Sequence, residues 1–147
     1  MDAIARNVPR NVPLAQLHPL HAILLGFPSS LFAGALLSDL AYQATFQVQW
    51  ANFSAWLIAG GLLVGAFVLL WALVGFVRSP AMRRGRAALY LAAIAAMWAL
   101  GFINALVHAK DAFATMPEGL YLSAGTALLA LFAAWIGYSG MPSREAR

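Results

Sequence analysis

The sequence contains no cysteine and very little charge. None of its 147 residues is Cys, and Asp, Glu, Lys and Arg together make up only 10% of them. The lack of cysteine excludes disulfides, iron–sulfur clusters held by thiolates and thiol catalysis within this chain. Gly-rich phosphate loops, H-E-x-x-H, G-x-S-x-G and paired carboxylates are also missing. The sequence therefore carries no signature of an enzyme class.

The scarcity of charge excludes an ordinary soluble domain. Soluble domains are about 25% charged, whereas this chain is 63% hydrophobic with a mean hydropathy of +0.77. Four apolar segments are long enough to cross a bilayer, at about 20–42, 55–77, 87–107 and 120–138. Their connections are short, so consecutive helices should run antiparallel. We predict an all-α fold, a four-helix up-and-down bundle embedded in the lipid bilayer, with residues 1–147 as one domain.

Two segments flanking the first helix need separate interpretation. The first apolar run is too long for the apolar part of a signal peptide, so we expect it to stay uncleaved. Residues 43–54, QATFQVQWANFS, are polar with aromatic residues interleaved. This composition predicts a connecting loop at the membrane interface.

The positive charge predicts the orientation. Of the nine Lys and Arg residues, all except Lys110 lie in the N-terminal arm (1–17), in the loop between the second and third helices, or in the C-terminal tail. The positive-inside rule then places both termini in the cytoplasm, as a multi-pass protein of the bacterial inner membrane. The basic charge indicates topology and contact with anionic lipid, and nucleic acid is not expected as a partner.

Polar residues inside a membrane are expensive, so each one is a candidate site. At the predicted outer face these residues are Asp39, Asn104, His108, Ser123 and Thr126. Asn104 and His108 share one face of the third helix, and Asp39 ends the first helix at the same depth. A His–carboxylate pair is consistent with a proton relay or a quinol-oxidising site. It is equally consistent with a static clamp between helices.

His18 and His21 lie at the predicted inner face, near Met82 and Arg86. His21 is a candidate haem-iron ligand, and a homodimer would pair it with its own copy. His21 and His108 cannot share one haem, because a helix running from His21 to Asp39 is roughly 27 Å long, close to the ~30 Å hydrocarbon thickness. The alternative is structural: His18 caps the first helix and His21 bonds to loop carbonyls.

Small residues indicate close helix packing. Gly61 and Gly65 form a GxxxG pattern in the second helix, which serves either packing within the bundle or dimerisation. We favour packing within the bundle.

The first helix contains a pattern formed by His18, Pro19, His21, Phe27, Pro28, Leu31, Asp39 and Leu40. In this pattern it resembles a family of bacterial inner-membrane proteins, domain of unknown function 2231. In the third helix, Asn104 and His108 match the family's His and Asn in reversed order. The resemblance implies a four-helix membrane domain, often encoded beside Rieske-type iron–sulfur proteins and sugar-aldehyde dehydrogenases, and hence membrane redox chemistry.

Three functions are consistent with these patterns. The first is a redox-associated subunit that moves electrons or protons through haem b or a quinone, or anchors a redox partner protein. The second is a structural or partner-binding membrane protein whose histidines only cap and clamp. The third is a small-solute transporter, which would need a hydrated path past Ser30, Asp39 and Asn104.

Overall fold

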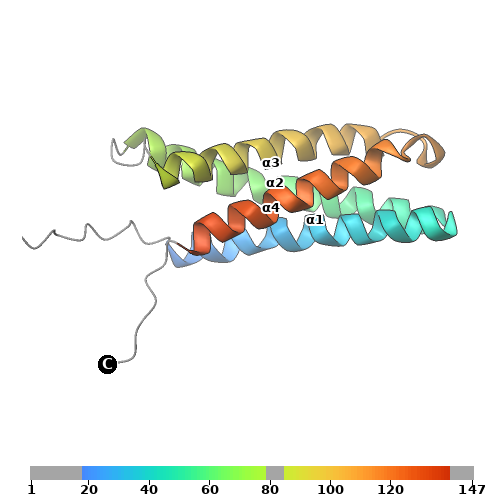
Figure 1. The fold of residues 1–147 in the computed structure, drawn as a ribbon, viewed down its shortest axis with the longest axis horizontal. Coiled ribbons are helices and arrows are strands. Elements are labelled where there is room, and N and C mark those ends of the chain that lie inside the picture. The colour runs from blue at the N-terminus through green and yellow to red at the C-terminus, as the bar shows by residue number, and fades with distance from the viewer. Residues whose placement is uncertain (1–17, 79–84, 140–147) are drawn as a thin grey trace, which may run out of the picture.

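A computed structural model describes residues 18–78 and 85–139 and folds them into four helices (Figure 1). These are α1 (Pro19–Thr45), α2 (Val48–Arg78), α3 (Arg86–His108) and α4 (Glu118–Tyr138), with one 3-10 turn at Ala112–Ala114 before α4. Both α1 and α3 pack against α2 and against α4, so the helices form a square. The predicted all-α four-helix bundle is confirmed. Met82 and the N-terminal arm lie outside the described residues.

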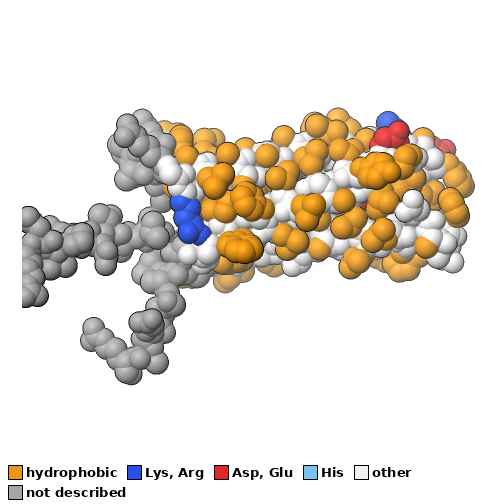
Figure 2. All heavy atoms as spheres, in the orientation of Figure 1, with side chains coloured by type: hydrophobic (Ala, Val, Ile, Leu, Met, Phe, Trp, Pro, Cys, Tyr) orange, Lys and Arg blue, Asp and Glu red, His pale blue; other side chains and the backbone are white. Residues whose placement is uncertain are grey.

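All four helices are long and apolar enough to cross a membrane. Large apolar side chains cover their outer surfaces, and on the face in Figure 2 the charged side chains gather near the two ends of the bundle. This distribution suits lipid along the sides and water or headgroups at the ends. The chain is a multi-pass membrane protein.

The second helix begins earlier than predicted. Residues 43–54 were expected to form a loop, but α1 continues to Thr45 and α2 begins at Val48. Phe46 ends α1 in the left-handed conformation, with its N–H donated to the Tyr42 carbonyl. The polar composition of this segment reflects its position at the membrane surface, where a helix needs no apolar outer face. At 31 residues, α2 is about 46 Å long, so it exceeds the ~30 Å hydrocarbon layer.

An apolar layer fills the middle of the bundle. The ring of Phe32 lies between two glycines: a Cβ added at Gly61 or Gly101 would approach its Cζ to 3.0 Å or 3.1 Å. Gly65 faces Met97 of α3. The GxxxG pattern therefore serves packing within the bundle, as predicted. The fully buried apolar side chains of this layer are Leu25, Phe32, Ile58, Val68, Ile94 and Met97.

Candidate functional site

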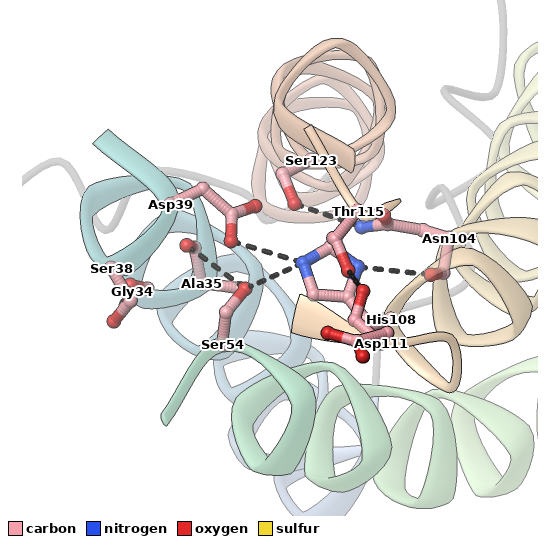
Figure 3. Close-up of polar contacts among 10 residues, drawn as sticks. All are labelled: Gly34, Ala35, Ser38, Asp39, Ser54, Asn104, His108, Asp111, Thr115 and Ser123. Carbon is pink, nitrogen blue, oxygen red and sulfur yellow. Dashed lines mark hydrogen bonds and ion pairs between the residues drawn. The ribbon is translucent and has the colours of Figure 1, made fainter. Parts of the chain in front are cut away.

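Polar side chains from all four helices meet at one end of the bundle, which we call the Asp39 end (Figure 3). They are Asp39 of α1, Ser54 of α2, Asn104 and His108 of α3, and Ser123 of α4. The antiparallel connections explain this meeting, because α1 and α3 end where α2 and α4 begin. The imidazole of His108 lies at the centre of the group.

Three polar contacts surround the ring of His108. Its Nε2 lies 3.0 Å from Asp39 Oδ1 and 3.2 Å from Ser54 Oγ, while its Nδ1 lies 3.0 Å from the Asn104 carbonyl oxygen. The predicted contact between Asp39 and His108 is present. It joins α1 to α3 across the diagonal of the square. The functional role of these residues stays a prediction.

The pair of Asp39 and His108 is sealed from solvent. The side chain of His108 is 2% exposed and that of Asp39 is 0% exposed. Ser54 and Asn104 are also fully buried. Burying a charged carboxylate or imidazolium costs free energy unless the charge is paired and hydrogen-bonded. A charge on either Asp39 or His108 is therefore stable here only if the two side chains stay in contact.

The acceptor at Nδ1 determines how many protons the pair holds. A carbonyl oxygen can only accept, so Nδ1 carries a hydrogen and donates it to Asn104. Nε2 and Asp39 Oδ1 are both acceptors when unprotonated, so their 3.0 Å contact needs a second proton between them. The pair therefore has no net charge, either as imidazolium and carboxylate or as imidazole and carboxylic acid. One proton lies in this hydrogen bond.

Three buried oxygen atoms at this end have no hydrogen-bond partner among the described residues: Asp39 Oδ2, Asn104 Oδ1 and the hydroxyl oxygen of Tyr42, one turn further along α1. The amide nitrogen of Asn104 donates to Ser123 Oγ at 2.9 Å, which leaves the hydroxyl hydrogen of Ser123 available. Figure 3 shows the free oxygen of Asp39 on the side toward Ser123. Thr126, expected in the same group, instead donates to the Leu122 carbonyl at 2.7 Å.

The start of α4 closes the site over the His108 ring. A Cβ added at Gly119 would lie 2.9 Å from His108 Cε1 and 2.7 Å from Thr115 Cγ2. Thr115 is 1% exposed, and its hydroxyl donates to the Asp111 carbonyl at 3.2 Å. Gly119 therefore lies directly against the imidazole, with Thr115 packed beside it.

The opposite end of the bundle holds the other two histidines. His21 Nε2 lies 2.8 Å from Tyr90 Oη, and the 2% exposed ring leaves Nδ1 without a partner among the described residues. Among the described residues the partner of His21 is the Tyr90 hydroxyl of α3, and the loop whose carbonyls were expected to bind it lies largely outside them, at residues 79–84. His18 does cap α1, accepting from the Leu20 N–H at 3.3 Å. Both imidazoles lie beside the Trp71 ring.

The described residues do not fit a haem within one chain. His21 Nε2 is already bonded to Tyr90, and His108 lies at the other end of the bundle with Asp39. His18, the remaining histidine, has Nδ1 engaged in the cap. No group of three or more His, Cys, Asp or Glu side chains that could hold a metal ion occurs in the described parts of the chain.

Comparison with known proteins identifies the family. A family model described as predicted membrane protein, DUF2231, matches residues 17–141. The chain belongs to this family. No curated protein and no solved structure matches the chain. Membership in DUF2231 agrees with the four-helix membrane bundle, and it assigns no activity to the Asp39 end.

Three residues of this DUF2231 chain contact His108 or His21 but were not among the site residues predicted from the sequence. Ser54 fell in the segment expected to be a loop, Gly119 was placed in the loop before the fourth helix, and Tyr90 lay inside the predicted third helix without being singled out. A longer second helix would have placed Ser54 near Asp39, since only two residues separate α1 from α2. No signal in the sequence identifies Gly119 as the contact of His108.

Proposed function

We propose that this protein is a redox-associated subunit of the bacterial inner membrane that binds and transfers a proton at its Asp39 end. Both termini lie in the cytoplasm in this proposal, so the Asp39 end faces outward. The observation that carries the proposal is the 3.0 Å contact between the buried Asp39 and His108, which holds one proton without net charge.

The placement of the pair supports a proton-transfer role. Ionisable groups inside membrane spans are costly and are usually functional. Imidazole exchanges its proton near neutral pH, which suits transfer to and from other groups. Asp39 and His108 lie at the ends of α1 and α3, so a proton would have a short route to the aqueous phase on that side.

The redox part of the proposal rests on the family resemblance, which implies neighbours such as Rieske-type proteins and sugar-aldehyde dehydrogenases. Of the two expected cofactors we propose a quinone. A quinone needs no pair of axial ligands, whereas haem b within one chain would need two at the same depth, which His21 and His108 do not provide. A redox partner protein would supply or receive the electrons.

The test is a redox-induced infrared difference spectrum of the purified protein with bound quinone. We expect a carboxyl C=O band and imidazole bands that change on reduction, and that disappear in Asp39→Asn and His108→Gln. Quinone extraction and a visible spectrum of the same sample report the cofactor. A preparation without quinone, or bands unchanged in both variants, contradicts the proposal.

One observation favours a structural function as the second candidate. The hydrogen bonds of the Asp39 end join α1, α2 and α3 at His108, and Asn104 joins α3 to α4. Such a network would clamp four helices without any chemistry. A clamp predicts that the infrared bands of Asp39 stay constant on reduction while the variants lose stability.

The structure gives little support to transport through one chain. Ser30, which was expected on a hydrated path with Asp39 and Asn104, is exposed on the outside of α1 and donates to the Gly26 carbonyl at 3.1 Å. The apolar layer around Phe32 and Ile58 separates the two ends. No polar route through the described bundle connects them.

A further inference from the structure

Ser54 is placed to control the proton of the pair. Its side chain comes from the second turn of α2 and is 0% exposed. Its Oγ lies 3.2 Å from His108 Nε2 and 3.3 Å from the Ala35 carbonyl oxygen of α1 (Figure 3). The carbonyl can only accept, while Nε2 accepts or donates according to its protonation.

A hydroxyl has one hydrogen, so Ser54 can donate to only one of these two neighbours at a time. While a proton lies between Nε2 and Asp39, the lone pair of Nε2 is in use. The Ser54 hydrogen then goes to the Ala35 carbonyl, which matches the contact at 3.3 Å. In this state every hydrogen around the His108 ring has an acceptor.

Loss of the proton would leave the lone pair of Nε2 facing a carboxylate, which is unfavourable in a buried site. A small rotation of the Ser54 hydroxyl supplies a hydrogen to Nε2 in its place. The Nδ1 hydrogen stays on the Asn104 carbonyl in both states. The ring of His108 can thus keep its position with the proton present (the loaded pair) or absent (the unloaded pair). The Asp39 carboxylate, left without a donor at Oδ1, then turns away from Nε2 toward Ser123, whose hydroxyl hydrogen is available.

We propose that Ser54 is a positioning residue that permits the Asp39–His108 pair to release its proton by donating to Nε2 of the unloaded imidazole. This inference rests on the proposed function, because it assumes that the proton leaves. Ser54 makes no contact with a cofactor in this proposal and acts through His108.

The surroundings of His108 leave this role to Ser54. Among the described residues, Asp39 is the acidic side chain bonded to the ring. The buried hydroxyl of Tyr42, also from α1, makes no hydrogen bond to the ring. From α4, Ser123 bonds to Asn104 instead. Asp111, in the connection before α4, is exposed, and its side chain accepts from the Phe113 N–H.

The experiment is nuclear magnetic resonance of the full chain in detergent, with 15N-labelled histidine and 13C-labelled aspartate. Only three histidines are present, and His108→Gln and Asp39→Asn assign the signals. The unloaded pair is the form in which Nε2 lacks hydrogen and the Asp39 carboxyl is ionised. Its ratio to the loaded pair is measured as the pH is raised.

We expect the ratio of unloaded to loaded pair in Ser54→Ala to fall about tenfold at a given pH, the factor that corresponds to one net hydrogen bond. Ser54→Thr keeps the hydroxyl and should restore most of the ratio. The matched control is Ser38→Ala, which removes a hydroxyl of α1 that donates only to the Gly34 carbonyl. This control should leave the ratio unchanged.

The outcomes separate the two proposals. If the wild-type pair unloads and Ser54→Ala unloads equally well, the role of Ser54 is wrong while the proton site stands. If the wild-type pair never unloads at any pH at which the protein stays folded, the proposed function itself fails. Should Ser54→Ala not fold, Ser54→Cys gives the same comparison, because a thiol is a weaker donor and an intermediate ratio is expected.

Discussion

Gly119 and His108 touch so closely that the first residue has no room for a side chain. A Cβ at Gly119 would lie 2.9 Å from Cε1 of the imidazole, a distance that atoms avoid. The glycine belongs to the first turn of α4, and its N–H donates to the Thr115 carbonyl at 2.7 Å. The start of α4 therefore determines where the ring of His108 can lie.

Gly119→Ala should displace the imidazole from Asp39. We expect a loss of about 1–3 kcal/mol in the free energy of unfolding, the usual cost of overpacking, together with a shifted His108 resonance. Unfolding in detergent and the 15N spectrum measure the two effects. The control is Gly125→Ala on the same helix, whose Cβ would meet only the flexible end of Leu100 at 3.0 Å. Equal effects of both changes would refute the role of Gly119.

A comparison of Asp39→Asn with Asp39→Leu should separate the proton held by the pair from the stability that its hydrogen bond gives to the bundle. The amide of Asn can donate to Nε2 of a neutral His108, so it keeps the 3.0 Å hydrogen bond but holds no mobile proton. We expect the free energy of unfolding of Asp39→Asn to lie within about 1 kcal/mol of the wild-type value. For Asp39→Leu we expect it to fall by about 1–3 kcal/mol, because Nε2 loses this partner. Proton release should be absent in both. An Asn variant as unstable as the Leu variant would contradict this account.

Gly61→Ala and Gly60→Ala test the packing of Phe32. At Gly61 the added methyl would meet the ring at 3.0 Å, whereas at Gly60 it would meet Leu31 at an ordinary 3.6 Å. We expect the first change to cost about 1–3 kcal/mol of unfolding free energy. The neighbouring change should be neutral or slightly stabilising, because Ala is the better helix former. Similar stabilities would show that the ring can move aside.

Tyr90→Phe tests the hydrogen bond of the buried His21. Removing the hydroxyl leaves both ring nitrogens of His21 without a partner among the described residues, at an expected cost of about 1–3 kcal/mol. Tyr138→Phe is the comparison, because its hydroxyl bonds to the Ala22 carbonyl at an exposed position where water can replace it. Thermal unfolding of both variants in detergent measures the difference. The idea fails if Tyr138→Phe is the more damaging change.

The sequence alone was sufficient to predict the four-helix bundle and the contact between Asp39 and His108. Long apolar segments determine the number of helices, and the cost of ionisable groups in lipid singles out the two residues. Antiparallel helices of similar length then bring the end of α1 to the end of α3. These steps need only the hydropathy pattern and the positions of a few polar residues.

The partners of these residues depend on helix rotation and on local turn geometry, which composition does not reveal. Ser54 was missed because the polar residues before it are typical of loops, although α2 starts at Val48. Tyr90 bonds to His21 only because α3 turns that face inward. The contact of Gly119 with His108 depends on the residue at which the connection from α3 ends and α4 begins. Such details follow from packing in three dimensions and not from spacing along the chain.

The apolar layer around Phe32 should also prevent charge from moving between the two ends of the bundle. No chain of hydrogen-bonded side chains joins His21 to Asp39 across the described residues, so the voltage of an energised membrane should fall across this layer. Moving one charge through it would cost or yield roughly 2.3 kcal/mol per 100 mV. In the proposed function, a proton held by Asp39 and His108 would therefore exchange only with the water on its own side of the membrane, and the bundle would not dissipate the membrane potential.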